Sequence, residues 1–191
     1  MKDIKVFDDI ISFEKQEEIK NLLYGDSFPW YFIKDVSNIR NKHQQRPAVT
    51  HLYVNEKQVN SDFYREIKVI SDMVCEKLKI EVEPIKVRSF MQFPLNKNFI
   101  GKQSLDTPHL DLPEKHIVFL YYVNDCDGET VIYDYKSKNA FELPYFEDVK
   151  IVKKIKPKQG RVVVFDGTTW HSSTQPTKGM RTIINFDVCT I

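Results

Sequence analysis

The sequence has no excess of charge of either sign and no long apolar run. Its 28 basic and 27 acidic residues nearly cancel, which leaves a net charge of +1. Proteins that bind nucleic acid through its phosphates usually carry a basic excess, so the composition does not favour a nucleic-acid partner. No stretch approaches the length of about 18 apolar residues that a membrane-spanning helix needs. The charged start, MKDIK, differs from the apolar core of a secretory signal. We therefore expect a cytoplasmic protein without a membrane partner.

Cysteine is also scarce. The three cysteines, Cys75, Cys126 and Cys189, are far apart and form no CxxC pair. An odd and scattered set argues against both a disulfide framework and a cysteine-based zinc site. We interpret them as reduced thiols.

The chain of 191 residues is long enough for one well-buried core. Apolar residues three and four apart predict helices over residues 13–23 and 62–79. Ser12 is a candidate cap for the first of these helices, and Gly25 a candidate stop. We expect a single domain, with a helical support region over residues 1–80 and a β core over residues 81–191.

In the second half of the chain, short β-branched and aromatic runs replace the helical period. They predict strands over residues 85–93, 116–123, 130–135, 149–155, 161–165 and 181–188. The expected fold class is α+β, mainly β, with a sandwich or a barrel-like roll. A polar, partly basic stretch over residues 34–47 is either a segment that closes over a site or a plain surface loop.

The motif His109-Leu110-Asp111 carries the first chemical signal. In an extended segment, residues two apart point to the same side, so His109 and Asp111 could bind one ion together. Two imidazoles and one carboxylate form the facial triad of non-haem Fe(II) oxygenases, which leaves positions open for substrate and O2. His171, after a predicted strand, is the candidate for the second histidine. H-x-D alone is a weak signal, because two residues at a fixed spacing often occur by chance.

Arg181 strengthens that interpretation, because it opens the predicted strand RTIINFDV ten residues after His171. The distal carboxylate of an iron-bound 2-oxoglutarate lies deep in its pocket, and a guanidinium can bind it with two parallel hydrogen bonds. The alternative is a strand-end arginine that lies in solvent or pairs with an acid such as Asp187.

The order of these motifs resembles a known family. The segments HLD, YYVNDCDGETVIYDY and PKQGRVVVFDGTTWHSSTQPTKGMRTIINF are similar to the prolyl-4-hydroxylase-like branch of the Fe(II)/2-oxoglutarate-dependent dioxygenases, over roughly residues 85–188. The resemblance implies a double-stranded β-helix (jelly-roll) core with iron at its open end. It also implies oxidative decarboxylation of 2-oxoglutarate coupled to hydroxylation of an unactivated C–H bond. The implied cofactors are Fe(II), 2-oxoglutarate and O2, with ascorbate as a further candidate.

The resemblance also assigns roles to individual residues. His109, Asp111 and His171 match the iron ligands, and Arg181 matches the anchor of 2-oxoglutarate. Other candidates for the 2-oxoglutarate pocket are Tyr122, whose hydroxyl would touch the co-substrate, Leu120 and Thr130. No catalytic residue is expected beyond the metal ligands.

In one place the sequence departs from its relatives. Where several of them have a tyrosine that contacts 2-oxoglutarate, this chain has Phe93, which supplies no hydroxyl. A donor could come from Gln92 or Arg88 instead, or the contact could be absent. His116 opens a predicted strand, and we expect it in the wall of the site or just behind the ligands, and not among the ligands.

Two other classes of protein stay open. A non-catalytic jelly-roll binding module would have no need of both the triad and Arg181, and a zinc hydrolase with the same ligands would have no use for a buried Arg181. For an oxygenase, the first expectation for the substrate is a prolyl residue in a peptide or protein, by analogy of fold. Nucleobase demethylation is disfavoured, because RTIINFDVC lacks the second arginine of such relatives. A small molecule stays an alternative.

Overall fold

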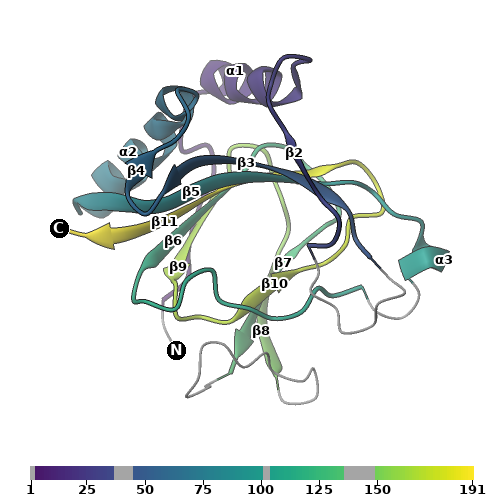
Figure 1. The fold of residues 1–191 in the computed structure, drawn as a ribbon. Helices are drawn as coiled ribbons and strands as arrows, with labels where there is room; N and C mark the ends of the chain where they lie inside the picture. The colour runs from purple at the N-terminus through teal and green to yellow at the C-terminus, as the bar shows by residue number, and fades with distance from the viewer. Residues whose placement is uncertain (1–2, 37–44, 101–103, 136–148) are drawn as a thin grey trace.

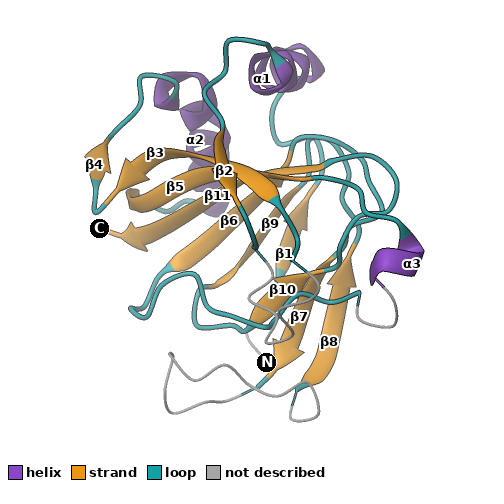
Figure 2. Cartoon of the chain, turned by 45° about the vertical axis from the view of Figure 1, so that its right-hand side comes forward, coloured by secondary structure: helices purple, strands orange, loops and turns teal. Residues whose placement is uncertain are grey.

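Two antiparallel β-sheets that face each other form the frame of the chain. The computed structural model describes residues 3–36, 45–100, 104–135 and 149–191. The larger sheet, here the main sheet, has the strand order β1-β9-β6-β11-β5-β3-β2, with β4 paired to β3. The small sheet has the order β10-β7-β8. Helices α1 and α2 lie on the side of the main sheet that faces away from the small sheet (Figure 1; Figure 2).

The elements of the two sheets have the following bounds. The main sheet contains β1 (Lys5–Phe7), β2 (Tyr31–Ile33), β3 (Ala48–Asn55), β4 (Gln58–Val59), β5 (Val82–Gln92), β6 (Ile117–Tyr122), β9 (Val162–Asp166) and β11 (Arg181–Thr190). The small sheet contains β7 (Thr130–Asp134), β8 (Lys150–Ile155) and β10 (His171–Ser173). The helices are α1 (Phe13–Tyr24), α2 (Tyr64–Leu78) and α3 (Lys97–Ile100).

Both predicted helices are confirmed. The hydroxyl of Ser12 accepts a hydrogen bond of 3.3 Å from the backbone N–H of Lys15, and α1 ends at Gly25. In α2, Ile67, Ile70 and Val74 are fully buried against the main sheet. These spacings of three and four place the apolar residues on one face of the helix, which explains how α2 covers the sheet.

The central strands of the main sheet are buried on both faces. Along β6, Phe119 and Tyr121 belong to the core beneath the helices, while Leu120 and Tyr122 belong to the core between the two sheets. Such strands read as continuous apolar runs, as IVFLYY does here. The same alternation in β11 sends Arg181, Ile183 and Asn185 into the space between the sheets.

The six predicted strands are all present, within three residues at each end, and the chain is mainly β. The first 80 residues do more than supply helices, because β1, β2 and β3 join the main sheet. Most of the stretch over residues 34–47, namely residues 37–44, lies outside the described residues. Among the described helices, none combines the length and the apolar character that a membrane span requires.

Candidate metal and co-substrate site

A backbone bridge brings the two predicted histidine ligands together. His109 lies in the irregular segment before β6, and His171 is the first residue of β10. The N–H of His109 donates to the carbonyl of His171 at 2.9 Å, and the N–H of His171 donates to that of His109 at 3.1 Å. This isolated β-bridge sets two residues side by side that are far apart in sequence.

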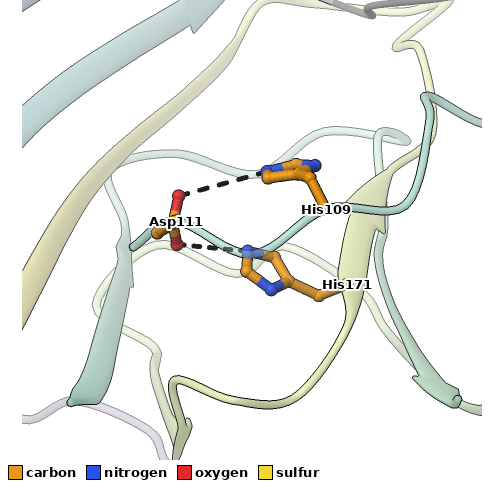
Figure 3. Close-up of side chains that lie close together, drawn as sticks. All are labelled: His109, Asp111 and His171. Atoms are coloured by element: carbon orange, nitrogen blue, oxygen red, sulfur yellow. Dashed lines mark ion pairs between the residues drawn. The ribbon is translucent and has the colours of Figure 1, made fainter. Parts of the chain in front are cut away.

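The three predicted metal ligands converge at this bridge. One side-chain ligand atom from each of His109, Asp111 and His171 lies within 4.8 Å of the others (Figure 3). The Asp111 carboxylate lies 4.0 Å from Nε2 of His109 and 3.2 Å from Nε2 of His171. A divalent ion held by these residues would have two nitrogens and one oxygen as ligands.

Both imidazoles are oriented for metal binding. Nδ1 of His109 lies 3.0 Å from the carbonyl oxygen of Thr107, and Nδ1 of His171 lies 3.1 Å from that of Thr169. A carbonyl can only accept, so each Nδ1 carries a proton, and Nε2 is the nitrogen left to bind a metal once it is deprotonated. A second hydrogen bond that fixes the tautomer is the usual arrangement for a histidine ligand. The residues present therefore fit Fe(II).

The charges around the site keep Asp111 ionised. Burial opposes its ionisation, but the positive charges of Arg88 and His171 outweigh burial and hold the pKa of Asp111 well below its usual value. Burial lowers the pKa of His109, and the neighbouring His171 lowers it further. Burial also opposes protonation of His171, but the charge of Asp111 outweighs it and raises the pKa of His171.

Two side chains from the main sheet hold the Asp111 carboxylate. Nη2 of Arg88, in β5, donates to one oxygen of Asp111. Nδ2 of Asn185, in β11, donates to the other oxygen at 3.2 Å. Sequence analysis considered Arg88 only as a donor to 2-oxoglutarate and did not identify Asn185.

A cavity of about 570 Å³ connects the metal site with Arg181. It lies between the two sheets and falls within the size range of small-molecule sites, about 300–1,000 Å³. Its wall contains all three predicted metal ligands, the predicted pocket residues Leu120 and Thr130, and Arg181. Asp35 and Val36, at the start of the polar stretch after β2, also line it.

Arg181 is buried at the far end of the cavity. Its side chain is held by three acceptors: Nε donates to the carbonyl of Gly128 at 2.9 Å, Nη2 to Thr130 at 2.9 Å and Nη1 to Gln92 at 3.3 Å. A guanidinium has five N–H groups, so one hydrogen remains on each terminal nitrogen for a carboxylate. Arg181 is therefore neither exposed to solvent nor paired with Asp187, which were the two alternatives.

Tyr122 lies one layer behind the cavity wall. It is fully buried, and its hydroxyl donates to Oγ1 of Thr130 at 2.6 Å. Thr130 therefore accepts from both Tyr122 and Arg181. The direct contact of Tyr122 with a co-substrate stays a prediction, and in this structure the tyrosine supports the residues that line the cavity.

Sequence analysis missed a buried polar cluster beside Arg181. Nε2 of Gln92 donates to Asp106 at 3.1 Å, while Oε1 of the same amide accepts from Arg181. Asp106 also pairs with Arg46 at 2.5 Å, with both side chains almost fully buried. Gln92 thus occupies the region where the sequence lacks the tyrosine of its relatives. Arg46 and Asp106 are 60 residues apart, and no local pattern links them.

The comparisons with known proteins agree with this geometry. Residues 95–186 match the family model described as the 2OG-Fe(II) oxygenase superfamily. Over these residues the chain is similar to that superfamily. The match includes the segment with His109 and Asp111, the strand with His171, and Arg181. No curated protein matches the chain.

Solved structures share the fold at low sequence identity. A prolyl hydroxylase from Trichoplax adhaerens, in complex with a peptide fragment of hypoxia inducible factor, is 17% identical with a TM-score of 0.59, over 96% of this chain and 82% of that one. A viral collagen prolyl hydroxylase from Paramecium Bursaria Chlorella virus-1, in complex with 2OG, is 14% identical with a TM-score of 0.57, over 97% and 94%. HygX from Streptomyces hygroscopicus, with nickel, 2-oxoglutarate and hygromycin B bound, is 12% identical with a TM-score of 0.60, over 98% and 82%. The expected jelly-roll core is confirmed.

Proposed function

We propose that the protein is an Fe(II)- and 2-oxoglutarate-dependent dioxygenase that hydroxylates an unactivated C–H bond. The observation that carries this proposal is the placement of a His2Asp donor set and a buried arginine on the wall of one cavity. A zinc hydrolase with the same ligands would need no buried cation at the far end of its cavity. A non-catalytic binding module would need no metal donor set.

In this proposal each part of the cavity has a distinct role. His109, Asp111 and His171 would hold the iron, which when bound supplies the activation of O2 for decarboxylation of 2-oxoglutarate and for hydroxylation. Arg181 would bind the distal carboxylate of 2-oxoglutarate through its terminal nitrogens and orient the co-substrate toward the metal. Thr130 fixes the guanidinium from one side, and Leu120 supplies apolar wall that limits the access of water.

The first substrate class to test is a prolyl residue in a peptide or protein. The fold is shared with a prolyl hydroxylase in complex with a peptide fragment, which supports this choice by analogy of fold. The fold is equally shared with HygX, whose structure holds hygromycin B, so a small molecule is the alternative. Mass spectrometry of proline-containing peptides and of small-molecule sets would reveal the gain of one oxygen atom and separate the two classes.

Anaerobic optical titration with Fe(II), then with 2-oxoglutarate, tests the reaction class. We expect a weak visible charge-transfer band in the wild type. In Arg181→Gln, which keeps the approximate size but loses the charge, we expect the dissociation constant of 2-oxoglutarate to rise roughly 30-fold or more, because a buried carboxylate loses its partner. Arg161→Gln is a matched control, because Arg161 pairs with Asp8 on the surface. A wild type without a band at saturating Fe(II) and 2-oxoglutarate contradicts the proposal.

A further inference from the structure

The inner face of β11 continues past the metal site to a buried acid. Alternation along the strand places Arg181, Ile183, Asn185 and Asp187 on one side, and the first three of them line the cavity. Asp187 lies beyond the cavity wall, and its side chain is completely buried. Neither the metal site nor the co-substrate anchor accounts for a carboxyl in this position.

The Asn185 amide joins this buried acid to the metal ligand. Its Nδ2 donates to Asp111 at 3.2 Å and to Oδ1 of Asp187 at 3.0 Å. A flipped amide would direct its oxygen at two carboxyl groups and would lose both hydrogen bonds. Asp187 therefore selects the orientation in which Asn185 presents a donor to Asp111.

His116 closes the far side of Asp187. Its Nε2 lies 3.7 Å from Oδ1 of Asp187, which is beyond hydrogen-bond distance, and both side chains are completely buried. Nδ1 of His116 lies 2.7 Å from the carbonyl oxygen of Glu114, which fixes the ring. Gly167 packs directly against the ring, where a Cβ would lie only 2.2 Å from Nε2. The imidazole is thus neither among the candidate ligands nor among the residues that line the cavity, and from its position behind the wall it confines the Asp187 carboxyl.

A contribution to the stability of the fold does not explain why these polar side chains are buried together. Several of its buried polar atoms have no hydrogen-bond partner among the described residues, namely Nε of Arg88, Nε2 of His116, Oδ1 of Asn185 and Oδ2 of Asp187. Each such atom costs roughly 1–3 kcal/mol unless solvent satisfies it. A cluster of this kind directly behind a metal ligand points to a role in holding that ligand.

We propose that Asp187 is a positioning residue that acts through Asn185 to hold the Asp111 carboxylate toward His109 and His171. This inference rests on the proposed function, because it assumes that Asp111 binds a metal. Arg88 holds the opposite oxygen of the same carboxylate, so the two contacts together restrict its rotation. Loss of either contact would leave the ligand free to turn away from the histidines.

Co(II) titration of the full chain tests the proposal, with the visible d–d band as a second readout of ligand geometry. Asp187→Leu keeps the approximate volume but cannot accept the hydrogen bond of Asn185. We expect it to weaken Co(II) binding roughly 10- to 100-fold and to alter the d–d band. Asp187→Asn retains an acceptor oxygen, so its Co(II) affinity should stay within about twofold of the wild type.

A double-mutant cycle shows whether Asp187 acts through Asn185. Asn185→Leu should weaken Co(II) binding to a similar extent, and Asp187→Leu should add less than about twofold in the Asn185→Leu background. The melting temperature of each metal-free variant shows whether it folds. If Asp187→Leu does not fold, the Co(II) affinity of Asn185→Leu still tests the proposal.

Three results would overturn the inference. They are wild-type affinity and an unchanged d–d band in Asp187→Leu, equal losses in Asp187→Leu and Asp187→Asn, and additive losses in the double variant. Failure of the wild type to bind Co(II) is a separate result, which contradicts the proposed function itself.

Discussion

At the scale of single residues, the proposed site depends on which atom of each side chain would face a bound metal. Backbone carbonyls fix the tautomers of His109 and His171, and Arg88 and Asn185 hold the two oxygens of Asp111. The sequence predicted the three ligands from residue type and spacing. It could not predict their supporting contacts, because these come from strands remote in sequence.

The buried carboxyl of Asp187 should make the stability of the metal-free protein depend on pH. Burial, together with the charge of Asp111, raises its pKa from 3.8 to about 7. Its charged neighbours are Asp111, Arg88, His171 and Lys86. A carboxyl with a raised pKa contributes stability that is fully present below its unfolded pKa and is lost as pH rises through its folded pKa. The wild type should therefore lose stability from about pH 4 to about pH 7, relative to Asp187→Asn, by up to about 4 kcal/mol.

Urea denaturation of the metal-free wild type and Asp187→Asn at several pH values measures this effect. Titrating groups remote from Asp187 are common to both proteins and cancel in the difference between their free energies of unfolding. That difference should change in favour of Asp187→Asn as the pH rises. Parallel curves for the two proteins would contradict the assignment of a raised pKa to Asp187.

At the scale of elements, β11 organises the site. One face of the strand buries Ile184 and Phe186 beneath the helices, and the other face carries Arg181, the proposed co-substrate anchor, together with Asn185 and Asp187. The strand was predicted from its β-branched and aromatic residues, and alternation from Arg181 would also have placed Asn185 on the cavity side. The short strand β10 was missed, because three residues carry no recognisable period.

The segment that joins β6 to β7 passes close to the start of β11. At Gly128 an added Cβ would lie 2.9 Å from Cδ of Arg181 and 3.0 Å from the carbonyl oxygen of Thr174. Gly128→Ala should displace the guanidinium and weaken 2-oxoglutarate binding roughly 10- to 100-fold, the loss expected when a charged hydrogen-bond donor is misplaced. Titration with 2-oxoglutarate measures the effect. The Co(II) affinity of the same variant is the control and should not change, because the metal ligands lie at the other end of the cavity.

At the scale of the whole molecule, the first 80 residues contribute more than sequence analysis expected. The run AVTHLYVN of β3 is rich in β-branched and aromatic residues, so a strand signal was present and was missed. The strands β1 and β2 also contain β-branched and aromatic residues, but three residues are too few to show a recognisable period. Arg46, just before β3, reaches Asp106 in the segment that leads to the metal ligands. That contact depends on the assembled fold, and local propensity cannot reveal it.

The Arg46–Asp106 pair should therefore link global stability to the site. Arg46 is 1% exposed, and its replacement leaves a buried carboxylate with Gln92 and Ser173 as neutral donors. Arg46→Met should lower the free energy of unfolding by about 3–5 kcal/mol, because one partner of a buried ion pair is lost. The double variant Arg46→Met/Asp106→Leu should be less destabilised than Arg46→Met alone, since no uncompensated charge remains. Urea denaturation measures both losses. A double variant that is less stable than Arg46→Met would show that Asp106 stabilises the fold mainly through its other hydrogen bonds.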